Sequence, residues 1–264
     1  MDASAKARSE RAALALLTFL LLAFPLSWYP WILALLAHRT SGPNPLGVLL
    51  AGLIASAVWR GWRGTRDLLL AIIRVRAPLA SWAGALLTGP AALGVALAIA
   101  RARGMAIHWM APPAELADRF VFTLLFVALG EEPGWRGTLL PLLQQIVHPL
   151  LAASIVAIVW AVWHLPLMGT EFAWPIVPAF AASVFGGAFV LAWLYNASGG
   201  SVLLPMLLHA ILNTVGAGYA FHLVDAGELP SLWAIYGAVW LAFGVLVVIL
   251  TRGRLGCAKA AAEA

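Results

Sequence analysis

The chain has 264 residues, of which 63% are apolar and 10% are charged, with a formal net charge of +5. Soluble domains contain roughly 45–50% apolar and about 25% charged residues, and disordered chains combine low hydrophobicity with high net charge. Both classes are excluded, so most of the surface must face lipid. The basic residues lie between apolar runs and form no stripe, and we therefore expect a lipid bilayer and no nucleic acid as partner.

Eight apolar segments approach the length of about 20 residues that a membrane-spanning helix needs. They lie near 12–37, 45–59, 79–100, 119–132 with a continuation to 147, 150–168, 176–195, 202–219 and 231–250. The second segment is short, and Pro25 and Pro30 interrupt the first. The sequence predicts an all-α fold, a polytopic membrane bundle of about eight transmembrane helices. We expect one domain over 1–264 with its core motif region at 119–219.

Basic residues are distributed unevenly between the two faces that these spans define. Eleven lie on the N-terminal face: Lys6, Arg8, Arg11, Arg60, Arg63, Arg66, Arg74, Arg76, Arg252, Arg254 and Lys259. Four lie on the other face, namely Arg39, Arg101, Arg103 and Arg119, together with Glu115, Asp118, Glu171, Asp225 and Glu228. The positive-inside rule therefore places both termini in the cytoplasm. We expect a multi-pass protein of the inner (plasma) membrane.

Two segments on the predicted cytoplasmic side are not spans. Residues 60–77 alternate arginines with leucines and isoleucines, which is typical of a helix at the lipid headgroups, although a loop without further role fits equally well. The alanine-rich tail, 253–264, is expected to be frayed. Cys257 is the only cysteine, so a disulfide framework and a cysteine metal site within one chain are excluded.

Polar groups at membrane depth are the informative residues, because each is costly unless it is paired or lines a cavity. They are Glu131, Glu132 and Arg136 in the run 130–137, His164 after Trp160, and His209 with Asn213. Glu132 and Arg136 are four residues apart and can pair on one helix face, whereas Glu131 points away from them. Each piece has a structural alternative: a carboxylate-capped helix start, a packed interfacial histidine, or a hydrogen-bonded pair between helices.

Helix geometry predicts that these groups converge. If 119–147 and 150–168 form a hairpin with its tip at His148 and Pro149, Glu131 and His164 both lie roughly 23–26 Å from that tip. His209 follows the loop at 196–201 and reaches roughly 12 Å into the bundle. We therefore expect a shared site in the cytoplasmic half of the membrane.

Such a set of groups is suited to hydrolysis of an amide. A carboxylate and an imidazole beside one water can deprotonate it for attack on a carbonyl, and a histidine with an amide can donate to the oxyanion that forms. Alternatively, His164, His209 and Glu131 could hold zinc, which would activate the water. The sequence does not separate these two schemes, so a cofactor is not firmly implied and a divalent metal stays possible.

The ordered set resembles the CPBP intramembrane proteases, which include the type II CAAX prenyl endopeptidases and the bacteriocin-processing (Abi) proteins. The resemblance covers about 120–215. It implies that Glu131 and His164 activate the water and that His209 and Asn213 form the oxyanion site. It also implies that Glu132 and Arg136 hold the first carboxylate in place. Trp160 stands where the family usually has phenylalanine.

We therefore expect an intramembrane endopeptidase, of the glutamate or metallo type, that acts near the cytoplasmic membrane face. Its substrate would be a membrane-associated or transmembrane peptide or protein. One alternative is an ion- or solute-transporting protein that uses the same polar groups. Transporters of this kind often contain inverted repeats with broken helices, and the sequence shows none. The other alternative is a non-catalytic scaffold of the same fold.

Overall fold

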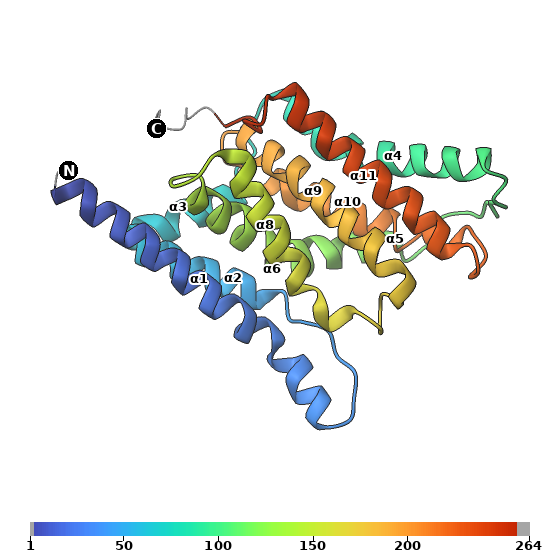
Figure 1. The fold of residues 1–264 in the computed structure, drawn as a ribbon, viewed down its shortest axis with the longest axis horizontal. Coiled ribbons are helices and arrows are strands. Elements are labelled where there is room, and N and C mark those ends of the chain that lie inside the picture. Colours follow the sequence, from blue (N-terminus) through green and yellow to red (C-terminus); the bar gives the residue numbers. More distant parts are fainter. Residues whose placement is uncertain (1–2, 258–264) are drawn as a thin grey trace.

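The computed structural model describes residues 3–257, with side chains from Glu10 onward. Every secondary-structure element assigned in that part is a helix. The long helices cross in one bundle (Figure 1). The α-helices are α1 Ala3–Leu36, α2 Leu46–Arg60, α3 Trp62–Ile72, α4 Leu79–Ala102, α5 Leu116–Phe122, α6 Leu129–Gly134, α7 Leu140–Leu143, α8 Pro149–Trp163, α9 Val177–Ala197, α10 Leu203–Val215 and α11 Leu229–Leu250. The all-α prediction is confirmed.

Six helices of the described part are long and apolar enough to cross a membrane. They are Glu10–Leu36, Leu79–Ala102, Pro149–Leu167, Trp174–Ala197, Leu203–His222 and Leu229–Leu250. The other two predicted spans fall short by this measure, because α2 has 15 residues and the helical run from Leu116 to Leu143 is divided into short segments. The protein is thus a polytopic membrane helix bundle. The expected number of eight spanning helices is not confirmed, since six of the described helices meet the length and composition of a span. The expected interruption of the first span is wrong, since α1 continues through Pro25 and Pro30.

The bundle has two distinct ends. At the first, which we call the basic end, Arg74 Nη1 donates to the Gly199 carbonyl (2.8 Å) and Asn196 Nδ2 donates to the Leu255 carbonyl (2.9 Å). At the opposite end, Tyr219 Oη donates to the Met110 carbonyl (2.7 Å). α1 begins and α11 ends at the basic end (Figure 1), and the segments 61–78 and 251–257, which lie there, contain six arginines.

Two predictions at the basic end are refined by the structure. The segment expected as an interfacial helix contains α3, which buries Leu68 and Ala71; its position at the headgroups stays a prediction. The tail does not fray from residue 253, because Leu255 is fully buried and its backbone N–H donates to Thr251 Oγ1 (3.1 Å). The remaining tail, 258–264, lies outside the described residues.

Glycines bring the helix of the two glutamates against α2. A Cβ on Gly130 would lie 2.7 Å from the backbone of Pro45, and one on Gly134 would collide with Val48. These two glycines are four residues apart and so lie on one helix face, where small residues let backbones approach closely. The close contact fixes α6 against the start of α2.

Candidate active site

The glutamates lie in the middle of an unusual helix. The short α6 is flanked by two π-helical segments, η1 (Thr123–Ala128) and η2 (Trp135–Leu139). Such segments appear mostly as local bulges inside α-helices and are frequent at functional sites. Glu131, Glu132 and Arg136 are all buried. The interpretation of this motif as a capped helix start is therefore wrong.

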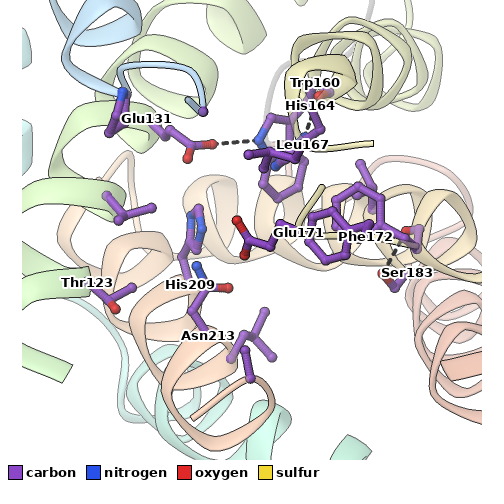
Figure 2. Close-up of a pocket in the computed structure, with 18 of the residues that line it drawn as sticks. Thr123, Glu131, Trp160, His164, Leu167, Glu171, Phe172, Ser183, His209 and Asn213 are labelled. Atoms are coloured by element: carbon purple, nitrogen blue, oxygen red, sulfur yellow. Dashed lines mark hydrogen bonds between the residues drawn. The ribbon is translucent and has the colours of Figure 1, made fainter. Parts of the chain in front are cut away.

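Glu131 is held by two indoles. Trp160 Nε1 on α8 donates to Glu131 Oε2 over 2.7 Å, and Trp135 Nε1 donates to the same oxygen over 3.4 Å. Figure 2 shows the first of these bonds between Glu131 and Trp160. Both donors are neutral, so the hydrogen bonds position the Glu131 carboxylate without a direct ion pair.

Glu132 is held by two cationic or ionisable donors. Arg136 Nη1 donates to Glu132 Oε1 (2.9 Å), and His209 Nδ1 donates to the same oxygen (2.8 Å). The Arg136 guanidinium also lies 4.2 Å from the centre of the Trp160 ring, within the range of a cation–π interaction. The expected pair of Glu132 and Arg136 is present. Glu132 of this pair is hydrogen-bonded to His209. The Glu131 carboxylate, which the pair was expected to hold, is instead held by the indoles of Trp160 and Trp135.

The hydrogen-bond partners define the protonation of both imidazoles at Nδ1. His164 Nδ1 lies 2.7 Å from the Trp160 carbonyl oxygen, and His209 Nδ1 bonds to a carboxylate. Because each partner accepts, each Nδ1 carries a hydrogen, and the neutral form of either ring then has its lone pair on Nε2. The Trp160 ring lies 5.5 Å from the His164 ring and 5.7 Å from the His209 ring, between centroids. Trp160 therefore contacts both histidines as well as Glu131.

One cavity of about 480 Å³ brings the four predicted catalytic residues together. Its lining includes Glu131, His164, His209 and Asn213, and its walls are mostly aromatic and aliphatic. Asn213 lies one turn beyond His209 on α10, is half-buried, and its amide makes no hydrogen bond to another group among the described residues. The amide is thus open to a molecule in the cavity.

Glu171 also lines the cavity, although its place in the sequence gives no sign of this. It lies in the connection between α8 and α9, and Figure 2 shows its carboxylate directed toward His209 and Asn213. In the sequence it is an isolated acid in the connection between two predicted spans, where a carboxylate is usually solvated. No spacing in the sequence signals its position.

The cavity lies toward the end opposite the basic end. Connecting segments that line it supply Gly42, Pro43, Glu171, Ala217 and Phe221, all of which belong to that opposite end. Two expectations, both termini in the cytoplasm and the site in the cytoplasmic half of the membrane, are therefore incompatible, because the cavity lies toward the end opposite the termini. The physical reason is that the hairpin tip lies at the basic end, so groups far from the tip lie toward the other end.

The zinc ligand set considered from the sequence is not assembled. Between residues 3 and 257, no three His, Cys, Asp or Glu side chains are arranged to hold a metal ion. His164 and His209 each use Nδ1 in a protein hydrogen bond, and one Glu131 oxygen accepts from two indoles. These contacts fix the orientation of both rings and of the Glu131 carboxylate at the cavity.

Comparisons with known proteins match the same part of the chain. The family model described as Type II CAAX prenyl endopeptidase Rce1-like matches residues 113–215, which include all the site residues named above except Gly42, Pro43, Ala217 and Phe221. A protein named CAAX prenyl protease 2, from Methanococcus maripaludis, is 26% identical over 102 residues. That alignment covers 35% of this chain and 38% of the relative. The resemblance of the motif region to the CPBP (CAAX protease) family is thereby confirmed.

Proposed function

We propose that the protein is an intramembrane endopeptidase in which Glu131 and His164 activate a water molecule. The observation that carries this proposal is that Glu131, His164, His209 and Asn213, from three helical segments, line one cavity. The family match over residues 113–215 and the name of the archaeal relative support the same class of reaction.

The proposed reaction begins with a water between Glu131 and His164. The Glu131 carboxylate takes a proton from the water, whose oxygen attacks the peptide carbonyl carbon while His164 Nε2 orients it. When the C–N bond breaks, the proton on Glu131 passes to the leaving amine. Trp160 positions both groups, because its indole N–H donates to Glu131 and its backbone carbonyl accepts from His164 Nδ1.

His209 and Asn213 act on the oxyanion. The Asn213 amide and the Nε2–H of a protonated His209 donate to the carbonyl oxygen as it becomes negative. Two ionised glutamates and one arginine leave the buried cluster with one net negative charge. A positive charge on His209 brings the cluster to neutrality, which the cost of burying net charge favours. Glu132 thus acts through His209.

The substrate in this proposal is a peptide segment of a membrane-associated or membrane-spanning protein in the plasma membrane. Its backbone would enter a cavity with aromatic walls, including Phe180, Trp233 and Tyr236. The lining includes connecting segments of one end and none of those at the basic end, so this cavity does not open at both ends. That arrangement favours a reaction chamber over the transport alternative.

The direct test uses the purified protein in vesicles with a library of single-span reporters. Each reporter carries a randomised peptide segment beside its span, on either side of the membrane. Glu131→Gln should abolish cleavage while its thermal unfolding midpoint stays within a few degrees of the parent protein. The matched control is Glu115→Gln, because Glu115 is exposed at the start of α5 and outside the cavity. Cleavage that persists in Glu131→Gln at the parent rate would reject the assigned base.

A further inference from the structure

The two ends of the bundle differ in both charge and access to the cavity. Along residues 3–257, ten basic residues belong to the basic end and four to the opposite end. The opposite end carries five acidic residues, one of which, Glu171, lines the cavity. The connecting segments are all short, which is the condition under which a bias in Lys and Arg sets orientation. The basic end therefore faces the cytoplasm.

The connecting segments that line the cavity belong to the other end. Its lining contains no residue from the connections at 61–78, 144–148, 198–202 or 251–257, which form the basic end. By contrast, the connections before α2, between α8 and α9 and after α10 all contribute to its walls. A substrate can therefore reach Glu131 from the non-cytoplasmic side without crossing the bundle.

Part of the cavity mouth faces lipid. Phe122 and Phe126 line the cavity, stack with their ring centroids 5.2 Å apart, and remain exposed on the helix that contains α5 and η1. Arg119, one turn before Phe122, and Glu171 line the cavity at the level of the connecting segments. A mouth with apolar rings beside charged groups is suited to a chain that leaves the hydrocarbon layer at the membrane surface.

We infer that the substrates are segments of exported or membrane-anchored proteins that lie beside the non-cytoplasmic membrane surface. This inference rests on the proposed peptidase function and specifies its substrate class. A prenylated C-terminus presented from the cytoplasm would meet the basic end, where no wall of the cavity is exposed. The inferred substrates therefore differ from prenylated proteins presented in the cytoplasm, the class that the relative's name indicates.

The first arm of the test determines which end faces outward. Single cysteines are introduced in a Cys257→Ser background, as Gly227→Cys at the cavity end or Trp62→Cys at the basic end. A Cβ on Gly227 meets nothing within 4 Å, and the Trp62 side chain is 72% exposed, so both positions tolerate a reporter thiol. In intact cells, a membrane-impermeant maleimide should label Gly227→Cys and should label Trp62→Cys only after permeabilisation. The reverse pattern overturns the inference.

The second arm compares two single-span reporters with the same randomised segment, one on each side of the membrane. Cleavage should occur in the reporter whose segment is outside and be lost with Glu131→Gln. Cleavage confined to the cytoplasmic segment overturns the inferred substrate side and leaves the peptidase proposal intact. If neither reporter is cleaved, the peptidase proposal fails and the inferred substrate class fails with it, whereas the labelling arm still decides the orientation of the cavity.

Discussion

Glu131 and Glu132 are adjacent in the chain but occupy different environments. Glu131 accepts hydrogen bonds from the neutral indoles of Trp160 and Trp135, and it lines the cavity. Glu132 is fully buried behind the cavity wall and accepts from Arg136 and His209. Successive residues on a helix point about 100° apart, so one carboxylate reaches the cavity while the other meets the charged partners.

The two environments suit two different tasks, proton transfer for Glu131 and structural support for Glu132. A carboxylate in an ion pair is a poor proton acceptor because its charge is already stabilised, whereas one held by indoles keeps its capacity to take a proton from water. Glu132 instead links Arg136 to His209 and fixes the ring that faces the cavity. The substitutions below test whether chemistry and structural support divide in this way.

The largest effect on stability is expected from Glu132→Gln. This substitution leaves Arg136 buried without its ion-pair partner, and breaking such a pair costs about 3–5 kcal/mol. Denaturant unfolding in detergent should show that loss, and cleavage should fall as well because His209 loses its acceptor. In Glu132→Gln with Arg136→Met, part of the stability should return without the activity. An unchanged unfolding free energy in the single variant would contradict the role given to Glu132.

Asn213→Ala should lower kcat about 10²–10³-fold, which is the usual effect of removing one oxyanion donor. Because the amide makes no hydrogen bond to another group among the described residues, KM and the unfolding midpoint should change little. The matched control is Thr214→Ala, the next residue on α10, which does not line the cavity. A rise in KM with kcat unchanged would show that Asn213 only binds substrate.

Trp160→Phe keeps an aromatic ring and removes the indole N–H that donates to Glu131. A hydrogen bond to a charged group contributes about 1.5–3 kcal/mol, so the cleavage rate should fall about 10–100-fold. Trp135→Phe should have a smaller effect because its bond to the same oxygen is longer, 3.4 Å against 2.7 Å. The two rates, measured side by side, test this order; a larger loss in Trp135→Phe would reverse it.

Chelation is expected to have the smallest effect. We propose that water activation needs no metal, since no three His, Cys, Asp or Glu side chains within residues 3–257 are arranged to hold an ion. Cleavage should therefore continue at the same rate after exhaustive chelation of the purified protein, with elemental analysis as the accompanying measurement. Loss of activity on chelation and its return with zinc would support the metallo scheme instead.

Polar groups are rare in apolar segments, so the sequence predicts which of them share a cavity. Glu131, His164, His209 and Asn213 were identified on that ground, and all four line the cavity. The helical spacing also predicts the pairing of Glu132 with Arg136, which the structure contains. Local spacing and composition therefore predict those cavity-lining residues that lie within the apolar spans.

Other features depend on contacts that sequence spacing does not encode. The bond from His209 to Glu132 joins residues 77 positions apart, and Glu171 reaches the cavity from a connecting segment. Six of the eight expected spans reach spanning length among the described residues, because α2 has 15 residues and π-helical segments divide the helix of the glutamates. The expected side of the site conflicts with the expected orientation of the termini, because depth along single helices does not show which connecting segments line the cavity.

The most direct measurement of the central claim is a single-turnover cleavage in water enriched in heavy oxygen. If Glu131 acts as a base on water, the new carboxylate of the product should carry the heavy isotope in the first turnover, and Glu131 should carry none. If the first product is unlabelled and the isotope appears in the Glu131 carboxylate instead, Glu131 attacks the substrate directly, which would contradict the mechanism.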